Sequence, residues 1–170
     1  MKSLIENFLQ NKNFYLSLVG EHLFITMVAI TIAIIVGVAV GVVISEKRKI
    51  AGIVISIVNV LYTIPSIALL GVLISVTGIG NKTAIIALTL YALLPVVRIV
   101  NIDEKIVEAS EAMGSTKFQT MYKVKLPLAF PVIFSAIRNM VTMTIALAGI
   151  ASFVGAGGLG VAIYRGITTN

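Results

Sequence analysis

The sequence predicts an all-α protein, a polytopic bundle of transmembrane helices. Of the 170 residues, 58% are hydrophobic and 12% are charged, about half the charged share of an average soluble domain. The charges are also clustered, because none occurs in residues 23–45, 50–81 or 139–164. Each stretch is long enough to cross the hydrocarbon core, which takes roughly 20 apolar residues as a helix. A soluble helical protein would need a polar exterior that this chain lacks.

The N-terminal residues 1–22 mix Phe, Leu and Tyr with Asn, Gln and Lys, a pattern that suits either an interfacial helix or a simple tail. The first span is expected at residues 23–44. Gly37 and Gly41 within it have the small-xxx-small spacing that lets another helix approach closely.

The second span is expected at residues 53–76 and contains Pro65. A proline inside a helix frees a backbone carbonyl, here near Leu61, so this span has a place to bend. The third span, residues 83–100, contains Pro95 and, near its end, Arg98.

The fourth span is expected at residues 127–153, and a polar, charged segment separates it from the third. After it comes a glycine-rich stretch, residues 155–160. No Gly-Lys-Ser/Thr sequence follows these glycines, so the stretch is not a nucleotide-binding loop. We expect it to give either close packing or a flexible turn at the outer mouth.

Basic residues predict the orientation of the chain. Residues 45–49 carry three, and residues 98–125 carry five. The loop 77–82 carries only Lys82. Because cytoplasmic loops are enriched in Lys and Arg, the two basic segments are expected in the cytoplasm, with the N-terminus and the loop 77–82 outside.

The cytoplasmic segment predicts two short helices joined at Gly114. Asn101 and Glu104 have the spacing of a capping box for a first helix over residues 102–113. Glycine suits the C-terminal end of such a helix, because that position often adopts a left-handed conformation.

The second short helix is expected to begin with another capping box, Thr116 and Gln119, and to stop before Pro127. The first helix has one apolar face, which could dock into a groove of a partner or pack against the protein's own membrane domain. That face comprises Ile102, Ile106, Ala109 and Met113.

Composition excludes several kinds of chemistry. The chain has no cysteine and only one histidine, His22, so a thiolate cluster, a disulfide framework and a histidine-rich metal site are all excluded. The acidic residues lie in loops and tails, and nothing resembles a hydrolytic triad or a paired-carboxylate site. We therefore expect neither catalytic residues nor a metal.

The predicted cytoplasmic segment contains Glu108-Ala109-Ser110, then Gly114 after three residues, Val124 after nine more, and Leu126-Pro127. This pattern resembles the EAA loop of the permeases of bacterial ABC importers, which has Glu-Ala-Ala, three residues, Gly, nine residues, Ile, one residue and Leu-Pro. This chain differs conservatively, with serine for the second alanine and valine for the isoleucine. The matching residues are Glu108, Ala109, Ser110, Gly114, Val124, Leu126 and Pro127.

Three further segments are similar to the permeases of osmoprotectant importers, which carry glycine betaine, carnitine, choline or proline betaine. These segments are residues 62–71, 84–95 and 153–160, and the resemblance extends over roughly residues 20–165. Methionine-importer permeases are more distant relatives.

The resemblance implies a transport subunit of the inner membrane that is not an enzyme and carries no cofactor. An ATPase subunit, which binds ATP and magnesium, would dock on the EAA loop from the cytoplasm. A second permease subunit, identical or different, would complete the pathway, and an external binding protein would deliver substrate. Residues 23–170 would form the transmembrane domain, with the coupling loop at 101–127.

Two departures from the family stand out. The stretch between Pro95 and Glu108 is several residues shorter than the family pattern, and the chain stops where a final membrane helix is expected. Alternative functions are a permease for methionine or another small amino acid, a stand-alone channel or carrier that needs no ATPase, and a membrane scaffold.

Two spans carry polar faces at helical spacing, which in lipid should face the bundle interior or water. They either line the translocation path or form hydrogen bonds between helices. Arg138 could bind a substrate carboxylate or hold carbonyls, and Tyr62 and Tyr91 are candidates for contact with a quaternary ammonium. The faces comprise Asn59, Tyr62, Thr63 and Ser66, beside Pro65, in the second span, and Ser135, Arg138, Asn139 and Thr142 in the fourth.

Overall fold

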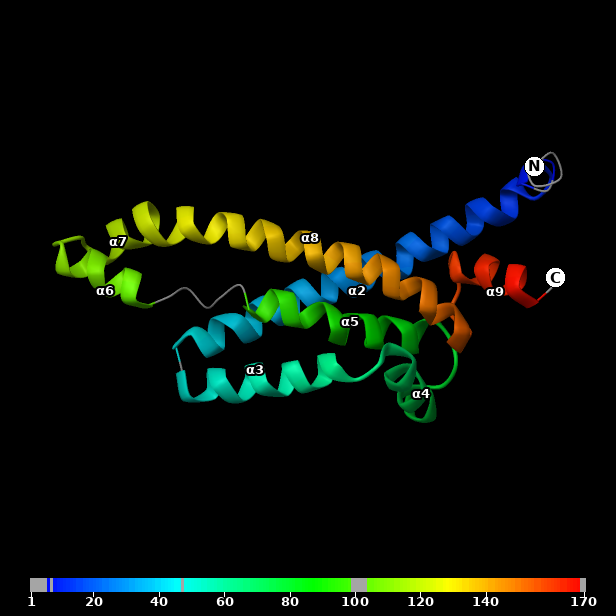
Figure 1. Cartoon of the computed structure of the whole chain (residues 1–170), viewed down its shortest axis with the longest axis horizontal. Coiled ribbons are helices and arrows are strands. Elements are labelled where there is room, and N and C mark those ends of the chain that lie inside the picture. Colours follow the sequence, from blue (N-terminus) through cyan, green and yellow to red (C-terminus); the bar gives the residue numbers. More distant parts are fainter. Residues whose placement is uncertain (1–5, 7, 47, 99–103, 169–170) are drawn as a thin grey trace.

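The computed structural model describes the chain except for residues 1–5, 7, 47, 99–103 and 169–170, and its described part is helical without strands. Three helices run along the long axis of the molecule (Figure 1) and pack on one another: α2 (Lys12–Glu46), α5 (Asn81–Arg98) and α8 (Leu126–Ala151). The all-α bundle that the sequence predicts is confirmed.

Small side chains allow these three helices to approach closely. Ala29 and Ala33 of α2 and Ala92 of α5 are buried in the core, and Met140 of α8 fills the space beside them. Gly37 lies directly against α5, because a Cβ placed on it would be 2.6 Å from Cγ1 of Val96. The close helix approach predicted at this glycine is therefore present.

The first span begins earlier than expected. Helix α2 runs without a break from Lys12 to Glu46, so residues 12–22 continue the helix of the span. No proline interrupts this stretch, and the apolar residues that precede Leu23 extend the hydrophobic surface of the same helix. Residues 12–41 are long and apolar enough to cross a membrane.

The bend that the sequence predicts at Pro65 is present in the second span. Helices α3 (Arg48–Thr63) and α4 (Ser66–Thr77) meet at an angle of 100°, as a broken span or a re-entrant segment. Pro65 has no backbone N–H and disfavours helical geometry in the preceding residue. The carbonyl of Ile64 accepts a hydrogen bond from the hydroxyl of Tyr91, which compensates the break.

The fourth span begins where it was expected, but the helix before it does not stop. Helix α7 (Lys117–Thr120), a π-helical turn (Met121–Lys125) and α8 follow one another directly, and Figure 1 shows them as one continuous rod. The expectation that the short helix ends before Pro127 was wrong. Because a π-turn widens the helix, it accommodates a proline ring that would clash with a carbonyl in the preceding α-turn.

By length and composition, two described helices can cross a membrane, residues 12–41 and 130–154, or three if the bent pair counts as one span. The apolar segment 81–97 within α5 is shorter. In the described residues, the four segments expected to span are thus mostly helical.

The glycine-rich stretch forms a closely packed turn. Its backbone donates two hydrogen bonds to distant side chains, from Gly157 N to Asn81 Oδ1 (3.0 Å) and from Gly158 N to Glu21 Oε2 (3.2 Å). Gly158 has a φ of 99°, and a Cβ there would lie 3.0 Å from Nδ1 of His22. Of the two expectations for this stretch, close packing is the one observed.

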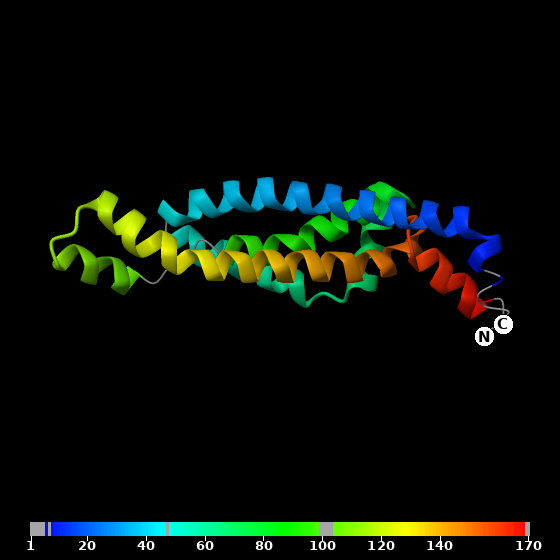
Figure 2. The ribbon, with the colours of Figure 1, turned by 90° about the horizontal axis from the view of Figure 1, so that it is seen from above.

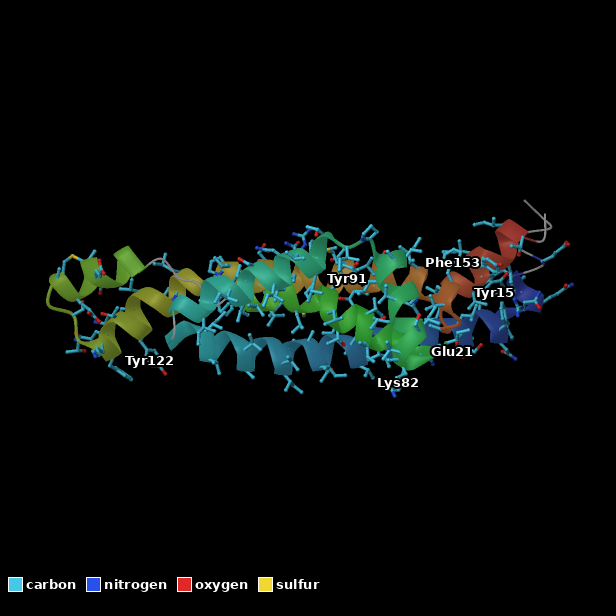
Figure 3. The ribbon with its side chains drawn as sticks, turned by 90° about the horizontal axis from the view of Figure 1, so that it is seen from below. Tyr15, Glu21, Lys82, Tyr91, Tyr122 and Phe153 are labelled. Carbon is cyan, nitrogen blue, oxygen red and sulfur yellow. The ribbon has the colours of Figure 1, made fainter. Side chains whose placement is uncertain are left out.

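The two ends of the molecule differ in content. The N-terminal part of α2 and α9 (Gly160–Thr168) lie at one end, and α6 (Glu104–Ala112) and α7 lie at the other (Figures 1 and 2). Figure 3 shows Glu21 and Phe153 near the first end and Tyr122 at the second. The N-terminal part of the chain is predicted to lie outside, and the loop that holds α6 and α7 is predicted to lie in the cytoplasm. The structure separates these two regions by the length of the bundle.

Candidate functional site

The turn at Gly114 ends α6 with a pair of backbone hydrogen bonds. Gly114 N donates to Glu111 O (2.9 Å), and Ser115 N donates to Ser110 O (3.2 Å). This is the Schellman arrangement, in which glycine takes the left-handed position, and Gly114 has a φ of 86°. The conformational role predicted for Gly114 is confirmed. The capping box at Asn101 and Glu104 lies outside the described residues.

The next helix begins with the capping box that the sequence predicts. Gln119 N donates to Thr116 Oγ1 (3.3 Å), and Thr116 N donates to Gln119 Oε1 (3.0 Å). Two backbone donors at the start of the helix are thereby satisfied.

A buried pair of hydroxyls joins the two helices of the loop. Ser110 of α6 and Thr120 of α7 are 2% and 1% exposed, and their hydroxyl oxygens are 3.1 Å apart. Ser110, which stands where the family pattern has alanine, thus makes a hydrogen bond across the loop. Sequence analysis included Ser110 in the loop but did not identify Thr120, whose partner lies in the other helix.

Three large apolar side chains are exposed on the loop, among charged and polar ones. Met113, Phe118 and Tyr122 are 81%, 72% and 60% exposed, and the rings of Phe118 and Tyr122 lie 4.9 Å apart. Ala109 is also exposed, so this member and Met113 of the predicted apolar face do not pack on the membrane helices. The side chains of Ile102 and Ile106 lie outside what the structure describes.

The remaining loop residues take different positions. Glu108 and Pro127 are exposed, and Val124 is half-buried in the π-helical turn. Leu126 is the first residue of α8, and its side chain is outside the described part.

A pocket of about 880 Å³ lies between α3, α5 and α8. It brings together one residue from the predicted polar face of the second span, Tyr62, and all four from that of the fourth. The volume is in the range of small-molecule sites. The lining comprises Tyr62, Leu94, Pro95, Pro131, Val132, Ser135, Ala136, Arg138, Asn139, Thr142 and Met143.

The orientation of Tyr62 is determined by contacts with two other helices. Its hydroxyl donates to Sδ of Met143 at 2.7 Å, and its ring lies edge to face with Tyr91 at 6.0 Å. The hydroxyl of Tyr91 in turn donates to Ile64 at the bend between α3 and α4. The tyrosine in the pocket is thus connected to the broken span.

The other residues expected on the second polar face do not line this pocket. Thr63 donates its hydroxyl to Val60 O within α3, Pro65 precedes α4 and Ser66 begins it. Asn59 is half-buried. The 100° bend carries Ser66 onto a different helix axis from Tyr62, so a spacing rule for one straight helix fails here.

Sequence analysis missed the apolar residues of the pocket, such as Pro131, Met143 and Pro95. Pro131 could have been found, because it lies four residues before Ser135 on the same helical face. Met143 could also have been found, because it lies four residues after Asn139 on that face, whereas only the packing of α5 against α8 brings Pro95 to the pocket.

The chain was compared with known proteins. A family model described as "Binding-protein-dependent transport system inner membrane component" matches residues 29–170. The carnitine transport permease protein OpuCD of Listeria monocytogenes (serotype 1/2a, strain 10403S) is 38% identical over 171 residues, covering 98% of this chain and 77% of that protein.

Two further matches point the same way. The glycine betaine/carnitine/choline transport system permease protein OpuCD of Bacillus subtilis (strain 168) is 40% identical over 162 residues, covering 92% of this chain and 71% of that protein. A solved inward-facing structure of the MetNI methionine ABC transporter is 31% identical, with a TM-score of 0.70 over 89% of this chain and 79% of that chain.

Proposed function

Because the chain belongs to the family of binding-protein-dependent transport system inner membrane components, we propose that it works with an ATPase to import quaternary ammonium osmoprotectants. Family membership confirms the resemblance read from the EAA-like loop and from the three flanking segments. The chain is a permease subunit of an ABC importer and not itself an enzyme. Glycine betaine, carnitine and choline are the substrates in the names of its relatives, and they are the substrates proposed for this chain.

The observation that supports coupling to an ATPase is the exposed helical loop at one end of the bundle. Its two helices are held together internally by Ser110 and Thr120, whereas Met113, Phe118 and Tyr122 are exposed. Exposed apolar side chains on short helices suit a groove on a partner protein. ATP and magnesium would bind in that partner, and its hydrolysis cycle would bias the bundle between two states.

The polar pocket supports the second part of the proposal, a translocation path along α3 and α8. Polar residues in membrane helices face the protein interior or water, yet Arg138 and Asn139 are exposed in the single chain. A second permease subunit, identical or different, would cover this face and enclose the path. A binding protein would deliver substrate at the end that carries α9 and the N-terminal part of α2, which is the external end under the proposed orientation.

Reconstitution tests the proposal directly. The chain is inserted into liposomes with its ATPase and binding protein, and uptake of radiolabelled glycine betaine is measured together with ATP hydrolysis. We expect uptake that requires both partners and ATP. Uptake by the chain without ATPase would instead establish a stand-alone channel or carrier.

Methionine is the second candidate substrate, because the structural match is to a methionine transporter. The same liposomes distinguish the two. ATP-driven uptake of radiolabelled methionine, with no uptake of glycine betaine, carnitine or choline, would overturn the osmoprotectant assignment while leaving the ATP-driven importer in place.

A further inference from the structure

Arg138 is a cation without an acidic residue on any helix that lines its pocket. Neither α3, α5 nor α8 contains Asp or Glu. Arg138 lies within the segment 130–154, which is long and apolar enough to cross a membrane. A charge at that depth is costly unless it is paired or hydrated. Arg138 is exposed, so water can hydrate it in the single chain, and an anionic group that pairs with it has to come from outside these three helices.

The rest of the pocket matches a small ligand with one polar and one apolar end. Ser135, Asn139 and Thr142 lie with Arg138 on α8 and can hydrogen-bond to a carboxylate or to water. The apolar part of the lining comes from all three helices, with Leu94 and Pro95 on α5 beside the ring of Tyr62 on α3, and with Pro131, Val132, Ala136 and Met143 on α8. An aromatic ring beside apolar side chains attracts a methylated ammonium, because the ring face carries partial negative charge.

Tyr62 is suited to this role because its ring is already held in place. The bond to Met143 and the edge contact with Tyr91 restrict its rotation. A preorganised ring binds a cation without the entropic cost of ordering a free side chain.

We infer that the pocket is a transient binding site for zwitterions in which Arg138 binds the carboxylate and Tyr62 contacts the quaternary ammonium. This inference rests on the proposed function and names the part of each substrate that each residue recognises. Glycine betaine and carnitine have both groups, whereas choline has a hydroxyl in place of the carboxylate. The two residues therefore affect the three substrates differently.

The test measures uptake of radiolabelled glycine betaine, carnitine and choline by liposomes that contain the complete transporter. Losing a charge-assisted hydrogen bond weakens binding by about tenfold or more. We expect Arg138→Gln to reduce uptake of glycine betaine and carnitine by about that factor and uptake of choline by less than about twofold. Arg138→Lys, which keeps the charge, retains part of the zwitterion uptake.

Tyr62 is tested in the same liposomes. Tyr62→Leu removes the ring and lowers uptake of all three substrates, whereas Tyr62→Phe keeps the ring face and most of the uptake. Arg165→Gln is the matched control for loss of a positive charge, because Arg165 lies 4.6 Å from the ring of Phe14 at the far end of the bundle. It leaves the preference among substrates unchanged.

Two results would overturn the inference alone: equal loss of all three substrates in Arg138→Gln, or no loss of any. Retained ATP hydrolysis and normal elution on gel filtration show that a variant has folded. If Arg138→Gln does not fold, the comparison of the three substrates is made with Arg138→Lys. Failure of the wild-type transporter to take up any of the three would instead overturn the proposed function.

Discussion

The hydroxyl oxygens of Ser110 and Thr120 lie 3.1 Å apart in a buried contact that joins α6 and α7, the two helices of the loop. Thr120 belongs to the helical rod that continues through the π-turn into α8. A force applied to α6 can therefore reach a membrane helix through this contact and through the turn at Gly114.

The first prediction concerns this pair. Ser110→Ala leaves the hydroxyl of Thr120 buried without its partner, which costs about 1–3 kcal/mol. The double variant with Thr120→Val removes both hydroxyls and should be less unstable than the sum of the two single variants. Hydrogen exchange of the amides in residues 104–120 measures the effect, and strictly additive changes would contradict it.

The second prediction uses the backbone of Gly114. A Cβ at this position would meet nothing within 4 Å, so a substitution acts through the positive φ and not through a clash. Asparagine tolerates this conformation, whereas a β-branched residue is strained by about 1–2 kcal/mol. Gly114→Val should lose both ATP-driven uptake and co-purification with the ATPase, and Gly114→Asn should keep most of each. Equal activity in the two variants would contradict a role for the left-handed turn at Gly114 in coupling.

The third prediction concerns the contact of α2 with α5. Gly37→Ala places a methyl group 2.6 Å from Cγ1 of Val96, and overpacking of this kind costs about 1–3 kcal/mol. We expect a lower midpoint of thermal unfolding in detergent and partial recovery when Val96→Ala is added. Gly71→Ala is the matched control, because nothing lies within 4 Å of its Cβ position. A similar loss of stability in the control would contradict the argument from packing.

The fourth prediction tests the orientation. The chain has no native cysteine, so a single introduced thiol is an unambiguous label. Lys117→Cys in the loop should react with a membrane-impermeant maleimide only in inverted vesicles, and Asn13→Cys only in right-side-out vesicles. Both positions are exposed. Labelling of Lys117→Cys from the external side would exclude an ATPase partner at this loop.

Several features could be read from the sequence because they depend on residues close together in the chain. The turn at Gly114 and the capping box of Thr116 and Gln119 follow from backbone hydrogen bonds within one helical turn. The polar face of α8 follows from the helical repeat. All four of its predicted residues line the pocket, because α8 has no sharp break in that region.

The bend at Pro65 was expected, whereas the uninterrupted helix through Pro127 was not, because the sequence does not show how each proline is accommodated. Pro65 and Pro127 are equally visible in the sequence, yet one accompanies a bend of 100° and the other lies in a continuous rod. The outcome depends on what surrounds each break. The hydroxyl of Tyr91 binds the carbonyl exposed at the first bend, and a π-helical turn precedes the second proline.

The amino-acid sequence by itself determined the helical segments, their membrane-spanning character and the short turns between them, because partition into lipid and local hydrogen bonding act over a few residues. Only the tertiary structure decided three contacts: Ser110 hydrogen-bonds to Thr120, Gly37 packs against Val96, and Tyr62 lines the same pocket as Arg138. These pairs are far apart in the chain or lie on different helices. Their contact therefore depends on how whole helices bend and pack, which no local pattern encodes.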